Sequence, residues 1–253
     1  MLTIPAKRGE FDFYHWLKLF EVWNVKKHVV GLEEGKNGYK HWQARIQLSG
    51  EGKQIIGGSE ISFFQYMKIY YPKAHIEEAS NTWEYERKEG KFWTSEDTAS
   101  ILAVRFGSLR PEQKKILQIL ESQGDREIDV WLDPSGNHGK SWLTVHLWET
   151  GRALVVPRSS TTAEKLSAFI CSSWKGEPIV IIDIPRSTKV SGSLLETMEE
   201  LKDGLVFDHR YTGRTRNVRG VKVMVFTNSE LPLKKLSKDR WRLHGIACDG
   251  SLT

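Results

Sequence analysis

The second half of the chain contains a β-branched run, a glycine-rich loop, an apolar stretch and a second β-branched run, in that order. The two runs are IDVWL (128–132) and PIVIID (178–183), and the loop is DPSGNHGKS (133–141). Such continuous apolar runs predict strands that are buried on both faces, as in parallel sheets whose strands are joined by helices. The order therefore predicts an α/β unit of the nucleotide-binding kind.

The loop carries the end of a phosphate-binding motif. Gly139, Lys140 and Ser141 match the end of GxxxxGK[ST], in which amides cradle phosphates, lysine reaches the outer phosphates and serine holds Mg²⁺. Pro134 replaces the first glycine of the motif, and Gly136 lies inside the loop instead. The alternative is a glycine turn with a chance Lys-Ser pair, which the strand–loop–helix context disfavours. The predicted ATP-binding residues of the loop are Gly136, Asn137, His138, Gly139, Lys140 and Ser141.

Asp183 ends the second β-branched run. A buried parallel strand that delivers a carboxylate at its C-terminal edge is what a Walker B site requires, so Asp183 is predicted to serve the same nucleotide. Ile184 occupies the position where a second acid is usual. This leaves open which residue activates water.

In the first half, apolar and polar residues alternate along HWQARIQL (41–48). The alternation predicts a strand in which His41 and Gln43 lie side by side on the face opposite the core. The preceding strand, 28–34, is joined to it by the turn GKNGY, and its parity brings Glu33 to the same face. Two oxygen ligands and one nitrogen ligand suit Mg²⁺ or Mn²⁺ better than zinc. Glu34 is the competing carboxylate, which a β-bulge would select.

A second group of reactive side chains lies in NTWEYERKEG (81–90), where a helix is expected. Tyr85 and Lys88 stand three residues apart and would share one side of that helix. A tyrosine hydroxyl can attack a phosphodiester when a metal polarises the phosphate and a lysine balances the developing charge. The alternative is an exposed amphipathic helix in which Glu84 and Lys88 form an ordinary ion pair.

Other helices are expected over residues 11–23 and 59–70, and a connecting helix begins at the proline of PEQKKILQILES (111–122). Strands and helices interleave in the first part of the chain, which predicts a compact α+β domain. The expected organisation is a first domain over 1–95, linker or oligomerisation helices over 96–125, and an ATPase domain over 126–253.

Three segments, LTIPA, GLEEGKNGYKHWQ and YERKEG, resemble in order the endonuclease motifs of the Rep proteins of circular single-stranded DNA viruses. The smacovirus Reps are the most similar, and circovirus and plasmid Reps are further away. The resemblance implies an α+β HUH endonuclease with a central antiparallel sheet. It implies that Tyr85 is the nucleophile, that Lys88 assists, and that Glu33, His41 and Gln43 bind the metal. Such enzymes nick an origin hairpin, leave the 5′ phosphate on tyrosine, and later rejoin the ends.

The second half resembles superfamily 3 helicases, which are α/β domains of AAA+-like fold. By this resemblance Asn228, at the end of VKVMVFTN, is sensor 1, and Arg240 is an arginine finger for the neighbouring subunit, with Arg242 as the alternative. The basic segment DHRYTGRTRNVRG (208–220) resembles the pore segment that grips single-stranded DNA. Its candidate DNA contacts act by phosphate attraction and stacking, and they are His209, Arg210, Tyr211, Arg214 and Arg216. The resemblance implies that the chain uses ATP and that it assembles as a homo-oligomer in the form of a hexameric ring.

The composition is compatible with these expectations. The net charge of +5 and an isoelectric point near 9.1 favour an anionic partner. The two cysteines give neither a disulfide framework nor a zinc cluster, and no apolar run approaches a membrane span. The expected partner is single-stranded viral or plasmid DNA with an origin hairpin. The expected setting is intracellular, in the nucleus of a eukaryotic host and otherwise in the cytoplasm.

Two other functions fit parts of the sequence. The first is a non-catalytic nucleic-acid binder of the α+β RNA-recognition type fused to a P-loop NTPase, which would tolerate Tyr85→Phe. The second is an inactivated Rep relative that still binds DNA, since Pro134 and Ile184 depart from the ATPase motifs. Robust ATP turnover stimulated by single-stranded DNA would exclude the second.

Overall fold

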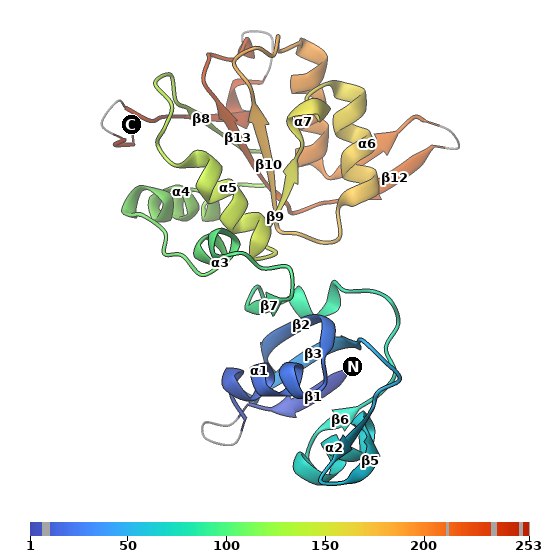
Figure 1. The fold of residues 1–253 in the computed structure, drawn as a ribbon. Helices are drawn as coiled ribbons and strands as arrows, with labels where there is room; N and C mark the ends of the chain where they lie inside the picture. Colours follow the sequence, from blue (N-terminus) through green and yellow to red (C-terminus); the bar gives the residue numbers. More distant parts are fainter. Residues whose placement is uncertain (7–10, 211–212, 234–236, 248–249, 253) are drawn as a thin grey trace. The chain divides into compact units, whose positions relative to one another are not determined.

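The computed structural model describes residues 1–6, 11–210, 213–233, 237–247 and 250–252 (Figure 1). The chain divides into two compact units, Met1–Phe106 and Gly107–Thr253. The residues expected in a connecting segment are thus shared between the two units. Within the described residues, none of the helices combines the length and the apolar character that crossing a bilayer requires.

The first unit is built on a five-stranded antiparallel sheet with the strand order β6-β1-β3-β2-β7. The two long central strands form the predicted hairpin, whose turn contains Gly38 at a φ of +74°, a value that glycine adopts without strain. The strands are β1 (Leu2–Pro5), β2 (Val25–Glu34), β3 (Lys40–Leu48), β6 (His75–Ile76) and β7 (Phe92–Thr94). A separate two-stranded hairpin is formed by β4 (Lys53–Ile56) and β5 (Ser59–Ser62).

Two helices, α1 (Phe13–Val22) and α2 (Phe63–Tyr70), supply Trp16, Leu19 and Met67 to the core that covers one face of this sheet. The expectation of a helix from residue 59 was wrong at its start. Ser62 caps α2, since its hydroxyl accepts a hydrogen bond from the amide of Gln65, and the residues before it pair as β5.

The expectation of a helix over residues 81–90 was also wrong. The structure has a single 3₁₀ turn, η1 (Tyr85–Arg87), followed later by α3 (Ala99–Arg105). Side chains of this segment form ion pairs with strands β2 and β3, so long-range contacts rather than helix periodicity fix its shape.

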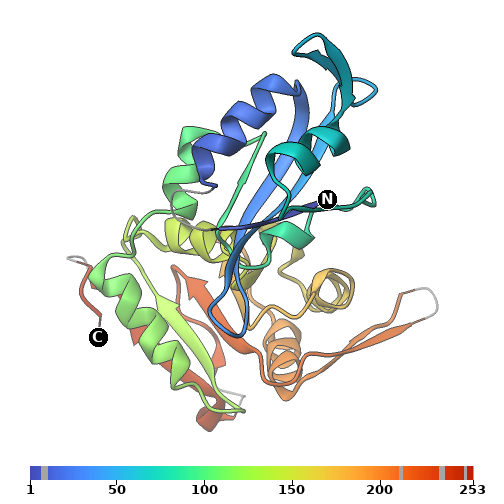
Figure 2. The ribbon, with the colours of Figure 1, turned by 90° about the horizontal axis from the view of Figure 1, so that it is seen from below.

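The second unit has the predicted parallel sheet, with the strand order β14-β8-β13-β10-β9 (Figure 1). Its strands are β8 (Ile128–Leu132), β9 (Ala153–Val156), β10 (Ile179–Ile184), β13 (Lys222–Thr227) and β14 (Trp241–Gly245). Helices cover both faces, and they are α4 (Pro111–Glu121), α5 (Lys140–Glu149), α6 (Ala163–Ser173) and α7 (Gly192–Asp203). A hairpin of β11 (Leu205–Asp208) and β12 (Arg214–Asn217) extends away from this sheet (Figure 2).

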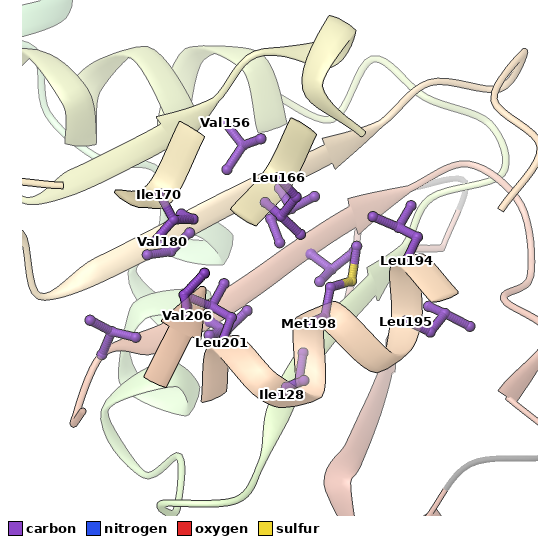
Figure 3. Packing of buried hydrophobic residues seen from close by; sticks show 14 of the residues in the cluster. Ile128, Val156, Leu166, Ile170, Val180, Leu194, Leu195, Met198, Leu201 and Val206 are labelled. Atoms are coloured by element: carbon purple, nitrogen blue, oxygen red, sulfur yellow. The ribbon is translucent and has the colours of Figure 1, made fainter. Parts of the chain in front are cut away.

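Alternate residues of the parallel strands point to different helices. On one face, Ile128 and Val180 pack with Leu166 of α6 and Met198 of α7 (Figure 3). On the other face, the core includes Trp131 with residues of α4 and α5. Because both faces are buried, the strands read as continuous apolar runs, and their C-terminal ends are left to carry polar residues.

Candidate functional site

The three predicted metal ligands lie on one face of the antiparallel sheet. In the register of β2 and β3, Glu33 is paired with His41 and Gly31 with Gln43, so these side chains point the same way. Oε2 of Glu33 lies 3.5 Å from Nε2 of His41. Glu34 is exposed, and its carboxylate lies 3.7 Å from the ammonium of Lys40. The carboxylate beside His41 is therefore that of Glu33.

Gly31 allows the tyrosine-bearing turn to lie directly on this face. A Cβ atom at Gly31 would overlap the carbonyl oxygen of Glu86 and would lie 3.2 Å from its carbonyl carbon. Nε of Arg45 donates to Oε1 of Glu86 at 3.0 Å, and both side chains are buried. Sequence reasoning missed these roles, although Arg45 has the parity of His41.

Lys88 joins the tyrosine to the carboxylate of the sheet. Its ammonium donates to the hydroxyl of Tyr85 at 2.9 Å and lies 2.8 Å from Oε2 of Glu33. Burial alone would lower the pKa of Lys88, but the hydrogen bonds to Glu33 and Tyr85 outweigh it and raise that pKa. Tyr85 remains 52% exposed.

The donor atoms at this site fit a hard divalent cation. Oε1 of Glu33 and Nδ1 of His41 are buried and have no hydrogen-bond partner among the described residues. The amide oxygen of Gln43 accepts from the hydroxyl of Thr3 at 2.7 Å, which orients it from strand β1. No cluster of three or more His, Cys, Asp or Glu side chains occurs in the described part of the chain.

The predicted phosphate loop joins β8 to α5. Gly136, Asn137 and Gly139 have positive φ values of +76°, +66° and +78°, which turn the chain sharply before the helix begins at Lys140. The amides at the start of α5 and the helix dipole favour an anion there. All three positions lie in the left-handed region, which explains why two of them are glycine, since glycine adopts that region freely.

Asp133, the first loop residue, organises the groups that would meet phosphate. Its buried carboxylate accepts from the amide of Gly136 at 2.7 Å and lies 2.9 Å from Nδ1 of His138. The ammonium of Lys140 forms an ion pair with its other oxygen. Burial would raise the pKa of Asp133, but the bonds to Lys140 and His138 lower it overall. Sequence reasoning missed Asp133.

The other predicted nucleotide residues end neighbouring strands. Nδ2 of Asn228, just past β13, donates to the carbonyl oxygen of Asp133 at 2.6 Å, which places it at the loop. Asp183 of β10 is bonded by two nitrogens of Arg158, at 2.9 and 2.6 Å. Arg158 lies in a 3₁₀ turn after β9 and was not anticipated from the sequence.

Sequence comparison identifies the relatives of this chain. No protein-family model matches it. The master replication protein of banana bunchy top virus is 23% identical over 307 residues, covering 97% of this chain and 94% of the relative. That of milk vetch dwarf virus is 23% identical over 261 residues, covering 94% and 88%. The Para-Rep C10 of the milk vetch dwarf C10 alphasatellite is 26% identical over 144 residues, covering 53% and 47%. The chain resembles viral replication proteins. The resemblance to Reps of circular single-stranded DNA viruses, expected from three short motifs, is confirmed.

In this Rep relative, both predicted finger arginines form ion pairs with acids of their own unit. Arg240 is buried, and its guanidinium lies 2.9 Å from a carboxylate oxygen of Asp203. Arg242 forms ion pairs at 3.0 Å with Glu127 and with the fully buried Asp129. Both side chains take part in ion pairs of the fold itself, and a finger role for Arg240 stays a prediction.

The predicted DNA contacts lie on the β11–β12 hairpin and its connection. Arg210 is bonded to Asp208 at 2.9 and 3.0 Å, and this pairing is the main reason that the pKa of Asp208 is lowered. Arg216 donates to the carbonyl oxygen of Trp174 at 2.8 Å, whereas Arg214 is exposed. His209 is also exposed, and Tyr211 lies outside the described residues.

Proposed function

We propose that the first unit is an HUH-type endonuclease that nicks and rejoins single-stranded DNA through Tyr85. The observation that carries the proposal is the ammonium of Lys88, which bridges the hydroxyl of Tyr85 and the carboxylate of Glu33 on the face that holds His41. This arrangement supports the proposal, because it brings a tyrosine hydroxyl, a lysine ammonium and two of the candidate cation ligands together on one face of the sheet.

In the proposed reaction, the oxygen of Tyr85 attacks the phosphorus and forms a new P–O bond while the bond to the 3′ oxygen breaks. The tyrosine proton passes to solvent and the leaving 3′ oxygen takes up a proton. Lys88, whose raised pKa keeps it charged, donates a hydrogen bond to the developing phenolate. Glu33, His41 and Gln43 would hold Mg²⁺ or Mn²⁺, which supplies Lewis-acid polarisation of the phosphate. Rejoining is the reverse, with a 3′ hydroxyl attacking the phosphotyrosine.

We propose that the second unit is an AAA+-like superfamily 3 ATPase that unwinds DNA. The strand order β14-β8-β13-β10-β9 supports this, because it gathers the phosphate loop, Asn228 and Asp183 at the C-terminal edge of one sheet. Lys140 and Ser141 would contact the phosphates and Mg²⁺, and Asp183 would hold the same ion. The exposed hairpin residues would contact single-stranded DNA, in a homo-oligomer of hexameric form.

The whole protein would then initiate rolling-circle replication, with ATP and a divalent cation as cofactors and a DNA origin hairpin as substrate. In a eukaryotic host this work would be done in the nucleus, and otherwise in the cytoplasm. The relatives are named master replication proteins, which supports a role in initiating replication.

The test is cleavage of a library of hairpin oligonucleotides in Mn²⁺ by the full chain and by Tyr85→Phe. The proposal expects a covalent protein–DNA adduct with the parent and none with the variant, while both bind the oligonucleotide. A parent that binds DNA and metal but forms no adduct with any member would rule out the nicking activity.

A further inference from the structure

The guanidinium of Arg186 lies at the phosphate loop, although no sequence motif singled it out. Arg186 follows β10 by two residues, and its Nη2 donates to the carbonyl oxygen of Pro134 at 2.6 Å. The same nitrogen lies 3.5 Å from the place where a Cβ of Gly136 would stand, and Nδ2 of Asn228 lies 3.9 Å from that place. Arg186 and the predicted sensor Asn228 therefore meet at one glycine of the loop.

Three other arginines considered for a role in ATP hydrolysis form ion pairs with acidic side chains. Arg158 bonds the carboxylate of Asp183, and Arg240 and Arg242 form ion pairs with acids of their own unit. The guanidinium of Arg186, by contrast, donates a hydrogen bond to a backbone carbonyl oxygen, and its side chain is exposed. A neutral carbonyl balances a guanidinium charge much less well than a phosphate oxygen does, so an entering phosphate can take this hydrogen bond.

We propose that Arg186 is a catalytic residue of the ATPase and acts in cis, on the γ-phosphate held by its own chain. The proposal rests on the proposed ATPase function. Water attacks the γ-phosphorus, the bond from that phosphorus to the β–γ bridging oxygen breaks, ADP leaves with that electron pair, and the proton of water passes to phosphate or solvent. Arg186 takes no proton, since a guanidinium stays charged; it stabilises the charge that develops on the transferred group. Arg186 therefore supplies positive charge. It does not replace the second acidic residue that usually follows the position of Asp183.

The experiment compares Arg186→Ala and Arg186→Lys with the parent, with Lys140→Ala, and with the matched control Arg126→Ala. Arg126 is an exposed arginine of the same unit whose ion pair to Asp239 is long, at 3.7 Å. Two quantities are measured: the kcat of ATP hydrolysis, and the equilibrium binding of ADP alone and of ADP with aluminium fluoride, which imitates the transferred phosphoryl group. The proposal expects kcat to fall about 1,000-fold in Arg186→Ala, in the range found for other arginine fingers.

The binding measurements separate catalysis from folding. ADP affinity should stay within about threefold of the control, while the added affinity given by aluminium fluoride is lost, because Arg186 acts on the transition state. Arg186→Lys should recover part of kcat, since lysine keeps the charge and loses the planar fork. Equal loss of both binding modes, or a kcat like that of Arg126→Ala, would overturn the proposal.

A mixing experiment tests the cis assignment. Arg186→Ala is mixed with Lys140→Ala, and no recovery of turnover is expected, because each chain lacks a group needed at its own site. Recovery in the mixture would mean that Arg186 serves a neighbouring chain, which contradicts the proposal. If the parent itself hydrolyses no ATP, the proposed ATPase function is wrong. The activity of the parent therefore tests that function separately from the role of Arg186.

Discussion

Replacing Gly31 by alanine tests how closely the tyrosine turn must approach the sheet. The new Cβ would overlap the carbonyl oxygen of Glu86 and lie 3.2 Å from its carbonyl carbon, whereas carbon atoms in contact are about 3.5–4.0 Å apart. Relief requires the turn and the strand to separate by about 1 Å, since the oxygen is closer still. Tyr85 and Lys88 lie on that turn, and Glu33 lies on that strand. A displacement of about 1 Å at a reacting group costs roughly 100-fold in rate, so Gly31→Ala should slow adduct formation by about that factor.

The assay is the initial rate of covalent adduct formation on a cleavable hairpin oligonucleotide, with Gly50→Ala as the control. Gly50 is in the same unit, and a Cβ there meets no atom within 4 Å. Overpacking should also lower the free energy of unfolding by about 1–3 kcal/mol, which urea titration of the full chain measures. A variant that forms adduct at the parental rate and unfolds at the parental urea concentration would show that the turn does not need this close approach.

Three further predictions follow from the same contacts. Arg45→Met removes one partner of the buried Arg45–Glu86 pair and should lower the free energy of unfolding by about 3–5 kcal/mol. The double variant Arg45→Met with Glu86→Leu should recover much of this loss. Urea titration measures both. Because the pKa of Lys88 is raised, its ammonium stays protonated as the pH rises. The rate of adduct formation by the parent should therefore not decline between about pH 7 and 9. Lys88→Met should form adduct roughly 100-fold more slowly across that range. Asp133→Asn should bind ATP more tightly, because it removes a negative charge beside the phosphates. Because the pKa of Asp133 is lowered in the folded protein, its ionised carboxylate stabilises the folded state at pH values above the ordinary pKa of an aspartate. This stabilisation is lost as the carboxylate is protonated in acid. The variant lacks the carboxylate, so its free energy of unfolding should fall less in acid than that of the parent.

The sequence predicted that Glu33, His41 and Gln43 share one face of the sheet, because strand parity is set by simple alternation. Trp42 and Ala44 must face the core, and this alone fixes the side on which His41 and Gln43 lie. The choice between Glu33 and Glu34 depended on the absence of a bulge, and the one irregularity of the β2–β3 ladder lies at its far end. The parallel sheet was predictable for a similar reason, since its strands are buried on both faces.

Contacts between distant residues were not predictable. The tyrosine segment forms a 3₁₀ turn instead of a helix because Glu86 pairs with Arg45 of β3, a partner 41 residues away along the chain. The roles of the arginines depend on such contacts too. No local pattern distinguishes Arg240, which pairs with Asp203, from Arg186, which reaches the phosphate loop.

Mass spectrometry of the covalent adduct, after nuclease and trypsin digestion, identifies the side chain that attacks the DNA. Trypsin should release residues 74–87, a peptide whose one tyrosine is Tyr85. We expect this peptide to carry the nucleotide residue, joined through a 5′ phosphate. Nucleotide found on a peptide that lacks Tyr85, or only unmodified 74–87 in a reaction that has cleaved the DNA, would contradict it.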